Sequence, residues 1–97
     1  MNLKKLDNYF KTNGLKYQDD YTDEGKYYID EIGFYIEYID NSYRLYLSIY
    51  HASEDNNAEN VDAHTDEYEE AFGSITELYE EYPDVVKSLY KHYEDVI

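Results

Sequence analysis

The sequence predicts a single α+β domain over residues 1–97, with an N-terminal helix, an antiparallel sheet of three or four strands, and two or three C-terminal helices packed on one face. Apolar residues recur every three or four positions near both ends of the chain, which indicates amphipathic helices. In the middle they alternate with polar residues, which indicates strands with one buried face. A chain of 97 residues also has about the size of one domain.

The first helix is predicted over residues 3–13. Its apolar residues are three or four positions apart and therefore form one stripe: Leu3, Leu6, Tyr9 and Phe10. Asn2 is a suitable N-cap residue, and Gly14 can adopt the positive φ that commonly ends a helix. The helix is thus expected to begin after Asn2 and to end before Gly14.

The sheet is expected to begin directly after this helix. Residues 15–21 are predicted to form its first strand, followed by a turn that contains Asp23, Glu24 and Gly25. Residues 26–39 are predicted to form either one strand bent at Gly33 or two short strands, because a glycine inside a strand often marks a bulge.

Residues 43–51, which follow a turn at residues 40–42, show the clearest alternation in the chain. One face of this strand carries Tyr43, Leu45, Leu47 and Ile49, and the other carries Arg44, Tyr46, Ser48 and Tyr50. Tyr35, Tyr46 and Tyr50 are predicted to lie on the sheet face opposite Leu45 and Leu47, where they could contact a protein partner. The chain has 15 Tyr, 3 Phe and no Trp, so about half of the tyrosines are expected to be ordinary core residues.

The last third of the chain is predicted to be a loop followed by helices. Residues 53–64 are expected to form an acidic, flexible loop of about 12 residues. Residues 66–82 are expected to form either one helix bent near Gly73 or two short helices, because Ser74 and Glu77 have the spacing of a capping box. Pro83 suits the first turn of a new helix, which is predicted over residues 83–95.

Composition excludes several functional classes. The chain has 23 Asp and Glu against 8 Lys and Arg, a formal charge of −15, so direct binding of nucleic acid through a basic patch is not expected. It has no Cys for disulfides or thiolate metal sites. It also shows neither an apolar run of the roughly 18 residues that span a membrane nor the pattern of a signal peptide.

The most informative feature is a long stretch without positive charge. Residues 45–86 contain no Lys or Arg but 12 acidic residues. On the predicted helix, most of the acids between residues 66 and 84 share one face, in a row about 27 Å long at about 1.5 Å per residue. The candidate partner-binding acids are Asp66, Glu69, Glu70, Glu77, Glu80, Glu81 and Asp84, with Asp23 and Glu24 as a second patch. An ordinary solvated helix face is the alternative, although such faces usually mix positive and negative charge.

Catalytic and metal-binding signals are weak. Residues 20–31 loosely match the spacing of an EF-hand calcium loop, but a hairpin turn is the preferred interpretation. His51, His64 and His92 have no ligand spacing along the chain, so neither a metal site nor a cofactor is expected. No phosphate-binding glycine loop or Gly-x-Ser-x-Gly motif occurs, and the protein is not expected to be an enzyme.

In size, charge and element order, the chain resembles small acidic phage-encoded proteins that mimic DNA, and it is most similar to anti-CRISPR proteins that block an RNA-guided effector nuclease. In that family, acidic side chains occupy the cleft that normally reads the PAM duplex. The resemblance implies a monomeric or dimeric inhibitor in the cytoplasm of a bacterial host. Its partner would be a basic nucleic-acid-binding protein, most plausibly a type II effector nuclease.

Two other functions fit the same composition. An immunity protein that neutralises a basic nuclease toxin needs the same electrostatic complementarity. An acidic calcium-binding or structural module would also use many carboxylates. The identity of neighbouring genes separates the first of these from a phage inhibitor, and a calcium-induced rise in melting temperature would favour the second.

The charge of −15 predicts that salt stabilises the fold, because like charges in the compact state repel one another. The melting temperature should therefore rise when NaCl is increased from about 10 mM to about 150 mM, as dissolved ions screen this repulsion. Circular dichroism melts at the two concentrations check the prediction. A flat or falling melting temperature would contradict it.

Overall fold

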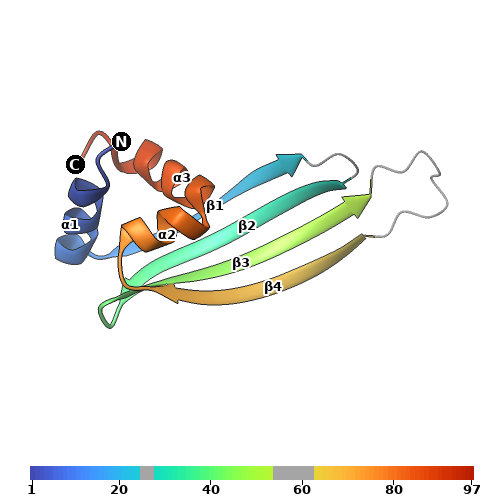
Figure 1. Cartoon of the computed structure of the whole chain (residues 1–97), viewed down its shortest axis with the longest axis horizontal. Coiled ribbons are helices and arrows are strands. Elements are labelled where there is room, and N and C mark those ends of the chain that lie inside the picture. The colour runs from blue at the N-terminus through green and yellow to red at the C-terminus, as the bar shows by residue number, and fades with distance from the viewer. Residues whose placement is uncertain (25–27, 54–62) are drawn as a thin grey trace.

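An N-terminal helix, a four-stranded antiparallel sheet and two C-terminal helices make up the fold in a computed structural model that describes residues 1–24, 28–53 and 63–97 (Figure 1). The predicted α+β class and element order are confirmed, with four strands and two C-terminal helices. No helix in the described ranges has the length and apolar character needed to cross a membrane.

Helix α1 covers Leu3–Asn13, the range predicted from its apolar stripe. The side chain of Asn2 accepts a hydrogen bond from the N–H of Lys5, so Asn2 is the N-cap residue. Gly14 ends the helix with φ 81°, a conformation that costs glycine little, and its N–H donates to the carbonyl of Phe10. Local sequence therefore determines both ends of this helix.

Strands β1 (Leu15–Glu24), β2 (Tyr28–Ile39) and β3 (Ser42–Ser53) follow in order, and each pairs with the next. β1 extends beyond the predicted residues 15–21, and β2 is one continuous strand through Gly33. Asp40 and Asn41 connect β2 to β3 with φ values of 53° and 61°. Asp and Asn tolerate this left-handed geometry, whose twist suits a two-residue hairpin turn.

The prediction of helix for residues 66–72 is wrong. Strand β4 covers Ala63–Phe72 and pairs antiparallel with β3, with Leu47 opposite Tyr68. The ladder to β3 overrides the helix propensity of the Glu and Ala residues in this segment. Ser53, Ala63 and His64 belong to strands instead of the predicted loop, and the rest of that loop, residues 54–62, lies outside the described residues.

Helices α2 (Ile75–Glu81) and α3 (Pro83–Tyr93) complete the chain. The Ser74 hydroxyl accepts a hydrogen bond from the N–H of Glu77, and the Glu77 carboxylate accepts one from the N–H of Gly73. This reciprocal cap places the start of α2 where the capping motif predicts it. Pro83 occupies the first turn of α3, which ends two residues before the predicted residue 95.

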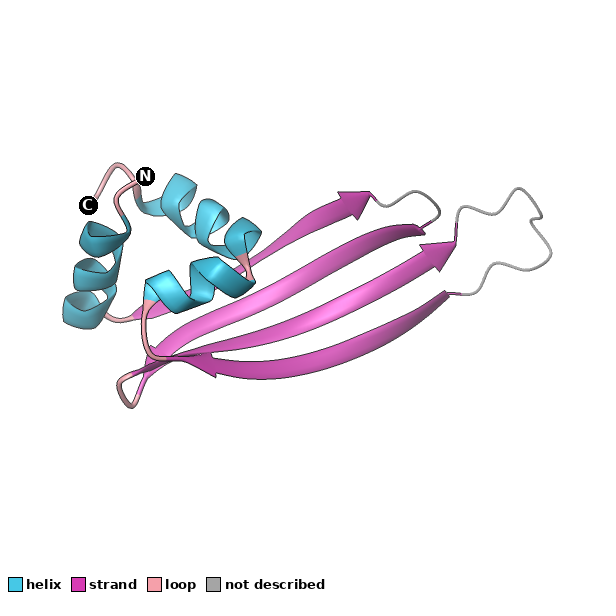
Figure 2. Ribbon diagram, viewed as in Figure 1, coloured by secondary structure: helices cyan, strands magenta, loops and turns pink. Residues whose placement is uncertain are grey.

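The three helices lie on one face of the sheet and gather over one end of it, while the strands continue past them (Figure 2). The molecule is accordingly elongated, with extents of 51 × 25 × 19 Å. The most buried side chains come from every layer of this covered end: Leu6, Phe10, Ile36, Tyr43, Leu45, Ile75, Leu78, Val85, Val86 and Leu89. We call the covered side the helix-side face and the other side the open face.

Asp7 connects α1 to the sheet and to α2. Its carboxylate accepts hydrogen bonds from the hydroxyl of Tyr43 at 2.6 Å and from the N–H of Ile75 at 3.4 Å, and it pairs with Lys11 at 2.8 Å. Burial raises the pKa of Asp7, but the bonds from Lys11, Tyr43 and Ile75 together lower it below its ordinary value. A lowered folded-state pKa stabilises the fold at neutral pH, and this contribution is lost as pH falls through that pKa.

Replacing Tyr43 by Phe should lower the free energy of unfolding by about 1.5 kcal/mol, because the part-buried Asp7 carboxylate loses its shortest hydrogen bond. Urea unfolding of the purified variant measures this loss. Tyr46→Phe is the matched control, since the Tyr46 hydroxyl has no hydrogen bond to another described residue, and its effect should be below about 0.5 kcal/mol. Equal stability of Tyr43→Phe and the parent protein would contradict the role of Asp7.

Candidate functional site

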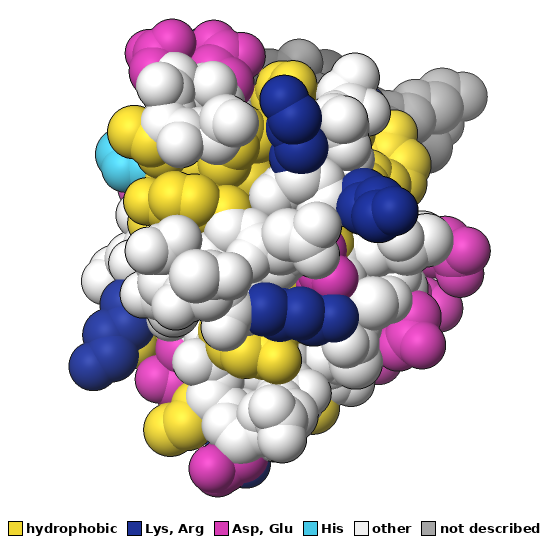
Figure 3. Space-filling model, turned by 90° about the vertical axis from the view of Figure 1, so that its left-hand side faces the viewer, with side chains coloured by type: hydrophobic (Ala, Val, Ile, Leu, Met, Phe, Trp, Pro, Cys, Tyr) yellow, Lys and Arg dark blue, Asp and Glu magenta, His cyan; other side chains and the backbone are white. Residues whose placement is uncertain are grey.

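Charge is segregated along the molecule. The described Lys and Arg residues all lie in helices or in the first three residues of a strand: Lys4, Lys5, Lys11, Lys16, Arg44, Lys87 and Lys91. Figure 3 shows basic side chains spread over the helical end of the molecule. That end is therefore the less acidic part of the protein.

The far half of the sheet consists of residues 20–24, 28–33, 48–53 and 63–67, beyond most of the helical cover. These segments contain no Lys or Arg. Their acidic residues are Asp20, Asp23, Glu24, Asp30, Glu31, Asp66 and Glu67. One end of the protein is thus strongly anionic, as the cation-free stretch of the sequence predicts, although strands carry the acids there.

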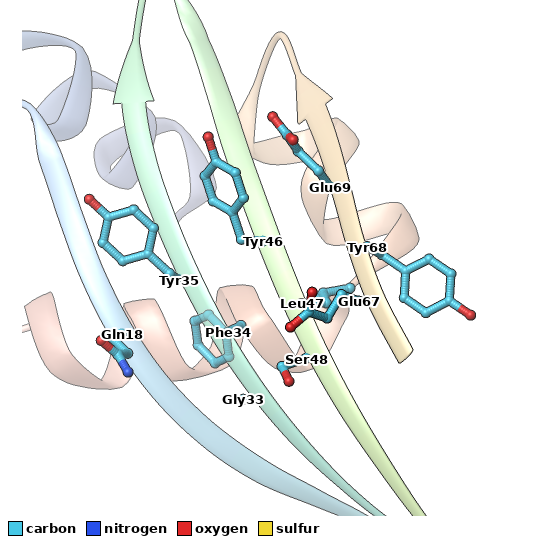
Figure 4. A pocket seen from close by; sticks show the side chains of 10 residues that line it. All are labelled: Gln18, Gly33, Phe34, Tyr35, Tyr46, Leu47, Ser48, Glu67, Tyr68 and Glu69. Carbon is cyan, nitrogen blue, oxygen red and sulfur yellow. The ribbon is translucent and has the colours of Figure 1, made fainter. Parts of the chain in front are cut away.

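The open face is built by the side-chain alternation of the four strands. Tyr35 of β2 lies directly opposite Tyr46 of β3, and Tyr46 lies directly opposite Glu69 of β4. Figure 4 shows these side chains, together with that of Glu67, on the side of the sheet turned away from the helices. Because residues two apart in a strand share a face, Glu67 and Glu69 both belong to this surface.

Two adjoining hollows run along the open face. The larger, about 580 Å³, is lined by side chains that include Gln18, Tyr35, Tyr46, Glu67 and Glu69. The second, about 450 Å³, is lined mainly by Asp20, Thr22, Glu31 and Tyr50. Gly33 and Ser48 line both hollows.

Gly33 lies between the two hollows and has no side chain to separate them. A methyl group at this position would lie 3.9 Å from its nearest neighbours, the Asp20 carboxylate and the Ser48 carbonyl, which is ordinary contact. Packing in the fold therefore does not require a glycine at this position. The two hollows therefore adjoin at Gly33 and Ser48, and we call them together the trough.

Tyrosines provide the rigid part of the trough. The rings of Tyr35 and Tyr46 have centroids 5.9 Å apart at 38° to each other, and the Tyr35 hydroxyl donates to Glu37 at 3.2 Å. Desolvation and this hydrogen bond raise the pKa of Tyr35, so its hydroxyl stays protonated. Tyr50 is 41 % exposed. The structure thus places all three sequence-predicted tyrosines on the open face.

The acids of the open face fall into two groups. Glu37 lies opposite Lys16 on one side and opposite Arg44 on the other, so its charge is balanced. Asp20, Glu31 and Glu67 are exposed, and no Lys or Arg among the described residues shares the far half of the face with them. Glu69 is also exposed, nearer the helical end, where Arg44 lines a shallow hollow with it. The uncompensated charge therefore lies along the trough, next to the tyrosines.

The remaining predicted acids do not form one row. On a strand, successive side chains point to opposite faces, so Asp66 and Glu70 lie on the helix-side face while Glu69 lies on the open face. Glu70 accepts a hydrogen bond from the Tyr82 hydroxyl at 2.8 Å. The acids of α2 and α3 are exposed on the helical side of the molecule: Glu77, Glu80, Glu81 and Asp84.

The second predicted patch is also divided. Asp23 is exposed and lies on the helix-side face. It is two residues from Tyr21, which is opposite the buried Ile32. The side chain of Glu24 and residue Gly25 lie outside the described part of the chain. Residues 20–24 pair antiparallel with residues 29–33, with Glu31 opposite Thr22, as in the preferred hairpin interpretation and unlike an EF-hand loop. The turn itself, residues 25–27, lies outside the described residues.

Two features of the structure were not predicted from the sequence: the open-face acids Asp20, Glu31 and Glu67, and a cluster of His51, His64 and Asp66. The ligand atoms of this cluster lie within 4.8 Å of one another. A period of two over residues 15–24, 28–39 and 63–72 assigns these acids to their faces. The cluster depends on the pairing of β3 with β4, which the spacing of histidines along the chain does not reveal.

Comparisons with protein-family models, with curated proteins and with solved structures found no match to this chain.

Proposed function

We propose that the protein is a stoichiometric inhibitor that mimics DNA and occupies the basic nucleic-acid-binding cleft of a bacterial defence protein. The proposed docking surface is the trough on the open face, and the first target to test is a type II CRISPR effector nuclease. The observation that carries the proposal is the group of exposed acids Asp20, Glu31 and Glu67, which have no Lys or Arg among the described residues of the far half, beside the tyrosines of the open face.

The sheet holds these charges at fixed spacing. Alternate residues of one strand are about 6.6 Å apart and neighbouring strands about 4.8 Å apart, so the carboxylates form a two-dimensional array. A DNA strand carries one negative charge per about 3.4 Å, and its protein partners meet it with clustered Lys and Arg. A rigid anionic sheet can contact the same basic side chains and exclude the nucleic acid.

Electrostatics favour association with a basic partner in two ways. The field of the far half of the sheet attracts a positive cleft and raises the association rate by about 10-fold to 1000-fold at low salt. Pairing with Lys or Arg also relieves repulsion among the carboxylates of the far half, where the described segments contain no Lys or Arg. The tyrosines add apolar contact area and hydroxyl donors at low entropic cost, as at many binding hot spots.

Neutralising the open-face acids should weaken inhibition. In the triple variant Asp20→Asn, Glu31→Gln, Glu67→Gln, the association rate with a guide-loaded type II effector should fall about tenfold at low salt. Surface plasmon resonance measures the rate, and a gel-shift assay follows displacement of the DNA target. The matched control is Glu80→Gln, Glu81→Gln, Asp84→Asn, which removes the same charge from the helices and should change the rate by less than about twofold.

The control variant also distinguishes the two possible docking faces. A larger effect of the helix variant would contradict the open face as the docking surface. If the parent protein leaves DNA binding by the effector unchanged, that target is wrong. The same competition with a basic nuclease toxin then tests the immunity-protein alternative, because the surface chemistry is shared.

Tyr46→Ala should weaken binding to the target by about 2 kcal/mol, because Tyr46 is a central, partly buried aromatic of the trough. Titration calorimetry provides the affinity. Tyr68→Ala is the control. Tyr68 is 53 % exposed, but it lies opposite Leu47 on the helix-side face, and its ring points away from the hollow (Figure 4). Equal losses in the two variants would indicate that the trough is not the contact surface.

A further inference from the structure

We propose that His51, His64 and Asp66 bind a divalent transition metal ion, with Zn²⁺ as the best-fitting ion, on the helix-side face of the far half of the sheet. The site lies on the face opposite the trough, and nothing in the proposed docking function requires it. The ligands come from two neighbouring strands: His51 belongs to β3, and the other two residues belong to β4.

Strand register brings the three ligands together. His51 lies directly opposite His64, and their rings stack with centroids 4.7 Å apart at 29°. Asp66 is two residues from His64 and therefore shares its face. Directly opposite side chains on neighbouring strands have Cβ atoms about 5 Å apart, which is within the reach of ligands to one ion.

The distances suit tetrahedral coordination. The Asp66 Oδ2 atom lies 3.2 Å from His51 Nε2 and 3.4 Å from His64 Nε2. For bonds of about 2.0 Å to a tetrahedral Zn²⁺ ion, neighbouring ligand atoms are roughly 3.3 Å apart. Two edges of the coordination tetrahedron are therefore already present in the arrangement of the side chains.

Asp30 positions His51 for this role. Its Oδ1 atom lies 2.7 Å from His51 Nδ1, on the side of the ring away from Asp66. In the tautomer that carries its proton on Nδ1, His51 donates this hydrogen bond and presents the lone pair of Nε2 to the ion. A carboxylate behind the histidine in this way fixes ring orientation and increases ligand basicity in many zinc sites.

The closeness of the three ligand atoms favours a metal ion between them. Neutral imidazole Nε2 lone pairs and a carboxylate oxygen repel at 3.2–3.4 Å unless a proton or a metal ion lies between them. A doubly charged ion satisfies all three atoms at once, and the surrounding acids of the far half of the sheet favour it. Direct hydrogen bonds between the two histidines and the carboxylates of Asp30 and Asp66, with no ion, are the competing arrangement.

The ligand set selects the class of metal. Two imidazoles and one carboxylate suit Zn²⁺ and similar transition ions, whereas Ca²⁺ and Mg²⁺ prefer sites made of oxygen ligands. Three protein ligands leave a fourth position for water. The bound ion would connect β3 to β4 near the end of their ladder, whose last described pair is Ala52 and Ala63.

Calorimetric titration of chelator-treated full-length protein with ZnCl₂, in excess Mg²⁺, tests the proposal. We expect one Zn²⁺ per chain and a rise in melting temperature with added Zn²⁺. His64→Ala should weaken binding by at least about tenfold, and Asp30→Asn by about tenfold with the stoichiometry kept. His92→Ala is the control with an unchanged affinity, because His92 lies in α3 against Tyr17.

A second measurement separates a built site from loose adsorption to carboxylates. Co²⁺ in a tetrahedral histidine site gives strong visible absorption, which His64→Ala should abolish, while circular dichroism verifies that this variant is folded. Absence of saturable Zn²⁺ binding would overturn the proposal in favour of direct hydrogen bonds between the histidines and the carboxylates. Undiminished binding in folded His64→Ala, or complete displacement of Zn²⁺ by Mg²⁺, would also overturn it.

Discussion

The pairing of β4 with β3 is the interaction on which the rest of the surface depends. Its register, with Leu47 opposite Tyr68, directs Glu67 and Glu69 to the open face and His64 and Asp66 to the helix-side face. A slip of one residue would exchange the two sets, because side chains alternate along a strand. The anionic trough and the histidine cluster are thus two consequences of one ladder.

The fold divides stability and surface chemistry between the two ends of one sheet. At the helical end, α1, α2 and α3 bury the apolar side chains, and Asp7 joins α1 to Tyr43 and to the start of α2. The strands extend beyond most of this cover, and there the acids gather on both faces. Repulsion among the carboxylates in the far half of the sheet is therefore offset by apolar side chains that the same strands bury at the helical end. The many charges on edge strand β4 also disfavour pairing with another sheet.

Local signals predicted much of the fold and part of the candidate site. The cap at Asn2, the glycine after α1 and the alternation of β2 and β3 are properties of neighbouring residues, and the three tyrosines of the open face follow from that alternation. A helix is predicted over residues 66–72 because Tyr68, Ala71 and Phe72 share the helical arc opposite the acids, although Tyr68 and Phe72 also share one face of a strand. The local pattern fits both, and the pairing with β3 decides between them. The histidine cluster was missed for the same reason.

Carboxylate footprinting of the protein in complex with a guide-loaded type II effector tests the central claim most directly. Carbodiimide-driven amidation labels exposed acids, and mass spectrometry reports the labelling of each residue with and without the effector. The account predicts protection of Asp20, Glu31, Glu67 and Glu69, with unchanged labelling of Glu80 and Glu81. Protection of the α2 acids with full labelling of the open face would contradict it.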